Sequence, residues 1–256
     1  MNTPCGTKNL VAIPVYNEQK YVAKVIERVA EHAKCILAID DGSTDYTPML
    51  LAMQPVDVIR NRENRGYGTA LRMAFRWAQM YHYEWVITMD CDDQHEPESL
   101  PDFFDAIKAD DADIINGSRY LSPELSESLP PPERQKINQT ITGWVRQGLG
   151  YHITDAFCGF RAYRVSALDK LDLDEDGYAI PLQQWVQFAA NGLSVKEVPI
   201  KLIYNDPNRT FGGVLDNAEE RLAHYREVFE NELAKHPEFG EGVIARMMQD
   251  TAGSAS

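Results

Sequence analysis

The sequence predicts an α/β fold in which helices cover both faces of a mostly parallel sheet. Short, uninterrupted apolar segments alternate along the chain with longer segments whose apolar residues recur at helical spacing. Acidic, glycine and arginine residues directly follow the apolar segments, where the carboxyl ends of parallel strands meet at one edge of a sheet. The 256 residues, 44% of them hydrophobic, can bury a full core. We therefore expect one large domain whose polar groups gather at that edge.

Most strands of this pattern are followed by a helix. The expected strands are residues 10–15, 35–39, 56–59, 85–89 and 113–116, with a late strand at residues 195–204. The expected helices are residues 22–33, a short helix through Leu50 and Met53, and residues 68–81, 97–109, 134–149, 181–190 and 216–234. Residues 121–133 hold Pro123 and a later run of prolines, which suits a surface loop that acts as a lid.

Composition argues against several classes of protein. The formal net charge of −14 argues against a nucleic-acid partner, because the phosphates would be repelled. The cysteines are widely spaced, which favours reduced thiols over disulfides; they are Cys5, Cys35, Cys91 and Cys158. No apolar run approaches the roughly 18 residues of a membrane span, and the first residues lack a signal-peptide pattern. We therefore expect a cytoplasmic protein.

The most informative segment is the strand at residues 85–89 with the acidic turn that follows it. Asp90 and Asp92 leave the strand on the same side, since side chains alternate with a period of two, and Asp93 points the other way. Two facing carboxylates suit a hard divalent cation, which completes its shell with water and substrate phosphates. The alternative is a solvated acidic turn. A second acidic turn at residues 40–45, after another strand, favours the metal site.

Further features have both a functional and a structural interpretation. The turn at residues 64–68 directs backbone amides toward the same edge and suits phosphate or ribose, but such a turn is also a common tight connection. Arg119 ends the fifth strand with a cation suited to phosphate. His95 fits a metal ligand or a structural hydrogen-bonding group. Asp155, among apolar residues, fits an acid–base group or a helix cap.

Taken in order, these segments resemble a known family. Residues 11–18 (VAIPVYNE), 40–45 (DDGSTD), 64–68 (NRGYG) and 90–95 (DCDDQH) are similar to motifs of the family-two inverting glycosyltransferases, which have the GT-A fold. Residues 113–120, 155–164 and 197–200 are similar to the dolichyl- or polyprenyl-phosphate mannose synthase branch. The resemblance covers residues 8–215. It implies a GT-A catalytic domain at residues 1–215, whose sheet binds a nucleotide-diphospho-sugar. We expect a helical extension packed on it at residues 216–248 and a disordered tail at residues 249–256.

The resemblance also implies roles for individual residues. The nucleotide sugar would be held by Pro14, Tyr16, Glu18, Asp41, Gly68, Asp90 and Arg209, with Asp41 at the base, Asp90 near the ribose or metal, and Arg209 closing over the donor. Asp92 and Gln94 would ligate Mg²⁺ or Mn²⁺. Arg119 and Arg134 would bind the acceptor phosphate. Asp92, Arg119 and Asp155 form the expected catalytic set.

The resemblance implies a hexose donor, GDP-mannose or UDP-glucose, with mannose the expected sugar, and a polyprenyl or dolichyl phosphate as acceptor. A phosphate acceptor is already ionised at neutral pH and needs positioning more than a base, so Asp155 would orient it. With a soluble or glycan hydroxyl acceptor, the alternative, Asp155 becomes the base. A lipid acceptor implies peripheral contact with the cytoplasmic face of a membrane. The apolar stripe Ile137, Ile141, Trp144, Val145 and Leu149 suits that contact or packing on the sheet.

The chain departs from the branch at two places. Asp93 and Glu96 add negative charge to the metal turn, and Arg209 and Thr210 stand where a serine–lysine pair is common. These differences leave the metal preference and the acceptor open. A sugar nucleotidyltransferase ranks behind, because no glycine-rich loop follows the first strand. A non-catalytic sugar-nucleotide binder also ranks behind, because the acidic turn is intact.

Overall fold

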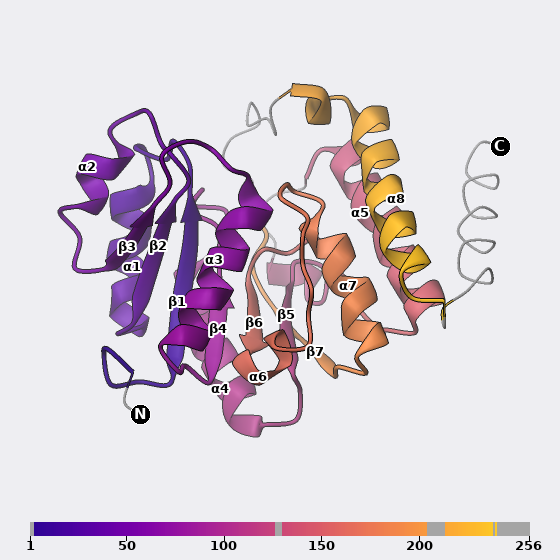
Figure 1. Ribbon diagram of the computed structural model, residues 1–256, viewed down its shortest axis with the longest axis horizontal. Helices are drawn as coiled ribbons and strands as arrows, with labels where there is room; N and C mark the ends of the chain where they lie inside the picture. The colour runs from indigo at the N-terminus through magenta and orange to yellow at the C-terminus, as the bar shows by residue number, and fades with distance from the viewer. Residues whose placement is uncertain (1–2, 126–129, 204–212, 238, 240–256) are drawn as a thin grey trace.

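The computed structural model describes residues 3–125, 130–203, 213–237 and 239. Within these residues, seven strands form one sheet in the order β3-β2-β1-β4-β6-β5-β7 (Figure 1). The strands are β1 (Asn9–Val15), β2 (Ile36–Asp40), β3 (Asp57–Arg60), β4 (Trp85–Thr88), β5 (Ile114–Ser118), β6 (Arg161–Arg164) and β7 (Val195–Pro199). Since six of them run parallel and β6 runs antiparallel to β4 and β5, the expected mostly parallel α/β fold is confirmed.

Strand β6 is the element that the apolar pattern does not predict. It pairs Ile87 of β4 with Ala162 and Ile115 of β5 with the same residue, so it separates two strands that would otherwise be neighbours. The strand is four residues long and has arginine at both ends, Arg161 and Arg164, so it lacks the continuous apolar character of the others. Its insertion carries the preceding residues 155–159 across the sheet to the end of β4.

The helices lie close to their predicted positions, except for the four-residue α6, which was not predicted. They are α1 (Val22–His32), α2 (Thr47–Leu51), α3 (Tyr67–Met80), α4 (Leu100–Ala109), α5 (Pro132–Leu149), α6 (Val165–Leu168), α7 (Ile180–Ala190) and α8 (Ala218–Ala234). Short 3₁₀ turns occupy Pro97–Ser99, Pro123–Leu125 and Gly213–Asp216. The expected lid at residues 121–133 and the late strand at 195–204 lie partly outside the described residues, and the tail at 249–256 lies wholly outside them. The division of the chain at residue 215 remains a prediction.

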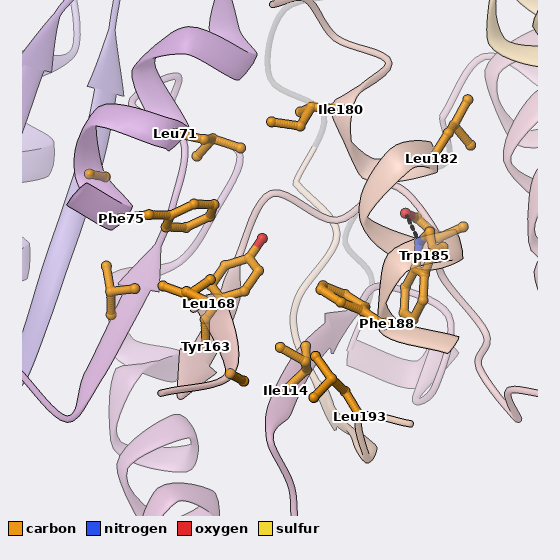
Figure 2. Packing of buried hydrophobic residues seen from close by; sticks show 14 of the residues in the cluster. Leu71, Phe75, Ile114, Tyr163, Leu168, Ile180, Leu182, Trp185, Phe188 and Leu193 are labelled. Atoms are coloured by element: carbon orange, nitrogen blue, oxygen red, sulfur yellow. Dashed lines mark hydrogen bonds between the residues drawn. The ribbon is translucent and has the colours of Figure 1, made fainter. Parts of the chain in front are cut away.

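Alternating strand residues fill two cores, one on each face of the sheet. Val11 and Ile13 pack with helices α1 and α4, whereas Leu10 and Ala12 pack on the face that α3, α5, α7 and α8 cover. Figure 2 shows part of this second core, where Phe75 of α3 faces Tyr163 of β6 with ring centroids 4.8 Å apart. The sheet is therefore covered on both faces, as the sequence predicts.

The apolar stripe on α5 belongs to this second core. Ile137, Ile141, Trp144 and Val145 are all buried, and the Trp144 ring lies 5.8 Å from that of Phe229 on α8. Figure 1 shows α8 alongside α5 at the end of the molecule away from β3. Of the two interpretations that the sequence leaves open, packing is confirmed, because four of the five side chains are buried and Leu149 packs, partly buried, against the same core. Membrane contact through this stripe is therefore wrong.

The expectation of four reduced cysteines is also wrong. Cys5 and Cys35 form a disulfide with their Cα atoms 5.7 Å apart, while Cys91 and Cys158 are free and buried. The reason is the sheet register. Cys5 precedes β1 and Cys35 precedes β2, and the two strands are parallel neighbours in which Val11 pairs with Ile36, so the chain segments before them meet at the same edge. Sequence spacing alone does not indicate this neighbourhood.

We expect Phe229→Ala to lower the free energy of unfolding by about 3–5 kcal/mol, because the ring is fully buried between α8 and the core. Urea unfolding at neutral pH measures this change. Glu227→Ala, an exposed position on the same helix, is the matched control and should stay within about 0.5 kcal/mol of the parent protein. Equal stability of the two variants would mean that α8 is not part of the folded core.

Candidate active site

A cavity of about 390 Å³ lies where the parallel strands end. Nine of the residues singled out from the sequence line it, although they come from five separate segments: Pro14, Tyr16, Glu18, Asp41, Asp90, Asp92, Gln94, Arg119 and Arg134. Most follow directly after β1, β2, β4 or β5, and Arg134 comes from the first turn of α5. Among the described residues, Gly68 and Asp155 do not line the cavity, and Arg209 lies outside the described residues. The sheet therefore brings most of the predicted site together.

The acidic turn after β4 separates its carboxylates as the strand period predicts. Asp92 faces the cavity, and its Oδ1 accepts a hydrogen bond from the Gln94 backbone N–H at 3.0 Å. Asp93 has a left-handed backbone (φ 59°), and its carboxylate contacts Lys24 Nζ at 2.7 Å and Arg28 Nη1 at 2.9 Å. The extra charge of Asp93 is thus directed toward α1 and balanced there. The Glu96 carboxylate likewise lies 3.5 Å from Lys201.

The donor atoms of this turn fit a divalent cation. Asp92 and Gln94 both reach the cavity, and Nε2 of Gln94 is buried with no hydrogen-bond partner in the described part of the chain. An amide that turns over presents its oxygen instead of its nitrogen, which gives a second oxygen ligand beside the carboxylate. No group of three or more His, Cys, Asp or Glu residues suited to a metal occurs among the described residues. A cation here would complete its shell with water and ligand phosphates.

Asp90 is held from three directions at the wall of the cavity. The Tyr67 hydroxyl donates to its Oδ1 at 3.0 Å, and burial, together with the Asp90 charge, raises the pKa of Tyr67 well above the ordinary value. The Asp90 backbone N–H donates to Nδ1 of His95 at 3.0 Å, so His95 is a buried structural group of the turn. A Cβ at Gly159 would lie 2.5 Å from Oδ2 of Asp90. Only glycine at position 159 leaves the carboxylate its place.

Asp41 lines the cavity but uses its carboxylate to hold the neighbouring loop. Oδ1 accepts from Asn61 Nδ2 at 2.7 Å and from the Arg65 backbone N–H at 3.0 Å, and Oδ2 accepts from the Gly66 N–H at 2.8 Å. These bonds fix residues 61–66 against the end of β2. Base recognition by Asp41 stays a prediction, and the hydrogen bonds show that its carboxylate shapes the loop at the end of β2.

Gly68 does not line the cavity, although the sequence resemblance placed it among the residues that hold the nucleotide sugar. Its backbone N–H donates to the Asp176 carbonyl at 2.7 Å, and that of Thr69 donates to the same oxygen at 3.3 Å. The segment at residues 174–177 therefore covers the amino end of α3, and a Cβ at Gly68 would lie 2.2 Å from the Glu175 carbonyl oxygen. The amide is thus unavailable to phosphate or ribose. The glycine is needed for close contact within the chain, which is the structural alternative considered above.

Arg119 and Asp155 form a bidentate ion pair behind the cavity. Arg119 Nε and Nη2 lie 2.6 and 2.9 Å from Oδ2 and Oδ1 of Asp155, and Asn138 Nδ2 donates to Oδ1 at 2.7 Å. Burial alone would raise the pKa of the fully buried Asp155, but the charge of Arg119 and these hydrogen bonds lower it below that of an ordinary aspartate. Burial lowers the pKa of Arg119, but the charge of Asp155 raises it by more, so the pKa of Arg119 lies above its ordinary value. Asp155 is therefore an ionised anchor for Arg119 and poorly suited to act as a base.

Beyond Arg119 the cavity continues between α5, α7 and α8. The cavity is also lined by residues to which the sequence analysis gave no role: Asn138, Phe157, Tyr178, Arg221 and Tyr225. The Tyr178 ring stacks on Tyr67 with centroids 5.5 Å apart, and the Tyr225 ring lies 4.9 Å from that of Phe157. The position of Tyr67 between two glycines in the turn at residues 64–68 could have indicated an aromatic residue at the site. No sequence pattern indicates Arg221 and Tyr225, because α8 is charged on most of its surface.

The comparison with known proteins identifies the family. The sequence matches the model of Glycosyl transferase family 2 over residues 10–172. The chain belongs to this family. It is 36% identical over 206 residues to the polyprenol monophosphomannose synthase of Mycolicibacterium smegmatis, covering 75% of this chain and 76% of that protein. It is 30% identical over 221 residues to the undecaprenyl-phosphate mannosyltransferase of Micrococcus luteus, covering 82% and 90%.

The fold of this family-two glycosyltransferase is GT-A. The structure of glucosyl-3-phosphoglycerate synthase from Mycobacterium tuberculosis bound to UDP superposes with a TM-score of 0.67 at 18% identity, covering 90% of this chain and 80% of that one. A complex of the same synthase with Mn²⁺, UDP and glucosyl-3-phosphoglycerate gives a TM-score of 0.63 at 16% identity. At these identities the likeness establishes the fold. The family resemblance and the fold expected from the sequence are both confirmed.

We expect Asp155→Asn to lower the free energy of unfolding by about 3 kcal/mol at pH 7, because Arg119 would keep its charge without a counter-ion. Chemical unfolding of both proteins measures the difference. Since the pKa of Asp155 is lowered in the fold, the contribution is present above the ordinary aspartate pKa of 3.8 and is lost as the pH falls through the folded-state value. The exposed pair Lys108–Asp105 supplies the control, and Asp105→Asn should be nearly neutral.

We expect Gly159→Ala to weaken binding of a nucleoside diphosphate with Mn²⁺ by about tenfold, because the new methyl group displaces the Asp90 carboxylate from the cavity wall. Calorimetric titration with UDP and with GDP measures the loss. Gly143→Ala is the matched control, since a Cβ there has no atom within 4 Å and alanine favours the helix. Unchanged affinity in the Gly159 variant would remove Asp90 from the nucleotide site.

Proposed function

We propose that this glycosyltransferase moves a hexose, mannose foremost, from a nucleoside-diphosphate sugar to a polyprenyl phosphate, with inversion at the anomeric carbon. The observation that carries the proposal is the single cavity that joins the acidic turn of β4 to the arginines of β5 and α5. The mannosyltransferase names of relatives at 30% and 36% identity support the same donor and acceptor classes.

The donor would occupy the part of the cavity nearest β1, β2 and β4. Pro14, Tyr16 and Glu18 form the wall after β1, and the loop fixed by Asp41 forms the next wall. Asp92 and Gln94 would hold a divalent cation, Mg²⁺ or Mn²⁺. When bound, such an ion neutralises the charge that develops on the departing nucleoside diphosphate. Asp90, fixed by Tyr67, would lie close to the ribose or the metal.

The acceptor would enter from the side of α5. The guanidinium of Arg134 would bind the acceptor phosphate. Arg119 is oriented by Asp155 and would bind the phosphate through its third guanidinium nitrogen, which does not contact Asp155. An ionised phosphate is its own nucleophile, so the residues only need to position it in line with the anomeric carbon. The alternative with a hydroxyl acceptor requires a base. Asp155 fits that role poorly, because it is fully buried, its pKa is lowered and both its oxygens face Arg119.

A polyprenyl acceptor requires access to a lipid surface. No helix within the described residues is long and apolar enough to span a bilayer. We propose peripheral contact at the cytoplasmic face of a membrane, made by a surface other than the α5 stripe, whose side chains are buried in the core. Flotation of the purified protein with anionic liposomes tests this contact separately from catalysis.

The direct test of function is transfer of labelled sugar from GDP-mannose and from UDP-glucose to a short polyprenyl phosphate, with Mn²⁺ and with chelator. We expect Asp92→Asn to lower the rate at least about a hundredfold, because the turn loses the charge that would hold the cation. The variant keeps Oδ1 and its hydrogen bond from Gln94, so the turn should remain folded. Lipid-linked product should form with wild-type protein only when metal is present.

The matched control is Asp93→Asn, which removes the same charge from the adjacent residue. Asn tolerates the left-handed backbone at this position, and the side chain is directed toward α1. Its rate should stay within about threefold of the parent. Equal loss in both variants would reassign the effect to net charge or folding. Transfer that continues in chelator would contradict the metal assignment, and donor hydrolysis without lipid product would favour another acceptor.

A further inference from the structure

Helix α8 contributes a second cation to the acceptor end of the cavity. Arg221 and Tyr225 lie four residues apart on one face of α8, and both line the cavity together with Arg134 of α5. Arg221 is 2% exposed, so its guanidinium forms part of the wall and does not extend into bulk solvent. We propose that Arg221 and Arg134 together bind the phosphate of the acceptor, an inference that rests on the proposed function and adds a residue to it.

The Arg221 side chain is already held in position. Its Nη1 donates to the Leu215 carbonyl at 2.7 Å, and its Nη2 lies 3.7 Å from Oε1 of Glu133. The Glu133 side chain is 55% exposed, so it is a weak and displaceable counter-ion. A guanidinium fixed in this way loses little rotamer entropy when an anion binds, which favours affinity. An entering phosphate would take over the place of the Glu133 carboxylate.

The two arginines also lie near one tyrosine hydroxyl at this end of the cavity. Burial raises the pKa of Tyr225 to about 12, while the charges of Arg221 and Arg134 both act to lower it, so the two cations lie near the same hydroxyl. A phosphate bound between the two guanidinium groups would carry a charge opposite to both, in a chain whose net charge is −14. A phosphate monoester carries up to two negative charges and accepts the paired hydrogen bonds that arginine offers.

Arg119 is less able to supply this second cation. Two of its three guanidinium nitrogens are bound to Asp155 in the bidentate pair. The cavity that Arg221 lines further indicates an acceptor with an apolar substituent, since Phe157, Ile137 and Leu202 line the same cavity. The ligand chemistry is therefore a phosphate monoester on a hydrocarbon chain. Because the family match ends at residue 172, this determinant lies outside the region that defines the family.

The test is calorimetric binding of citronellyl phosphate, a short soluble isoprenyl phosphate, and of glycerol phosphate as the polar source of the same group. We expect Arg221→Gln to weaken citronellyl phosphate binding about tenfold to a hundredfold, and Arg221→Lys to recover part of the loss. UDP and GDP binding should change less than twofold, which also reports that the variant is folded. Arg226→Gln is the matched control, because Arg226 is on the same helix and does not line the cavity.

Glu133→Gln separates phosphate binding from a structural role of Arg221. A role in tying α8 to α5 predicts that the Glu133 and Arg221 variants weaken binding together. Competition between Glu133 and phosphate predicts the opposite sign, with Glu133→Gln tightening citronellyl phosphate binding severalfold. Glycerol phosphate should bind more weakly than citronellyl phosphate while keeping its dependence on Arg221.

Unchanged binding in Arg221→Gln, or a parallel loss of nucleotide binding, would overturn the inference. The outcome is separable from the proposed function. Absence of sugar transfer by the wild-type protein, with citronellyl phosphate binding that still depends on Arg221, would reject polyprenyl-phosphate transfer and retain the phosphate subsite. Transfer by the wild-type protein with normal acceptor KM in Arg221→Gln would retain the function and reject the role of Arg221.

Discussion

The buried carboxylate of Asp155 is the contact on which the rest of the site depends. It binds Arg119 at the end of β5 and Asn138 in α5, and it accepts a local hydrogen bond from the backbone N–H of Phe157, so two segments distant in sequence are tied to its own loop. A buried charge of this kind is stable only while all its partners are in place. The pair therefore fixes α5 and the end of β5 relative to each other, and it directs the remaining nitrogen of Arg119 at the cavity.

The antiparallel strand β6 makes this contact possible. Because β6 lies between β4 and β5, the residues that precede it cross the ends of both strands. Asp155 meets β5 at one end of this crossing, and Gly159 meets Asp90 of the β4 turn at the other. The acidic turn and the arginine wall are thus held by one short segment. A shift of that segment would move the acidic turn and the arginine wall together, which under the proposed function couples the donor and acceptor geometry.

The sequence predicted the parallel strands and the residues after them because both follow from local pattern. Apolar continuity marks β1, β2 and β4, and the residues after a parallel strand must lie at the same edge of the sheet. The failures came from contacts that local pattern does not carry. Strand β6 is paired on both sides but has arginines at its ends, Gly68 is covered by a segment more than a hundred residues away, and Cys35 meets Cys5 through strand register. Arg221 on α8 was missed for the same reason.

Under the proposed function, these two kinds of contact divide the cavity into a donor half and an acceptor half with different origins. The donor half is built from strand ends, whose positions follow from the sheet and from the segment that the family shares. The acceptor half adds α8, which packs on α5 and α7 through residues such as Phe229 and reaches the cavity with Arg221. A helix packed on the outside of a sheet can change its cavity-facing residues without disturbing strand pairing. Under the proposed function, substitutions in this wall would therefore change the choice of acceptor and leave the donor chemistry in place.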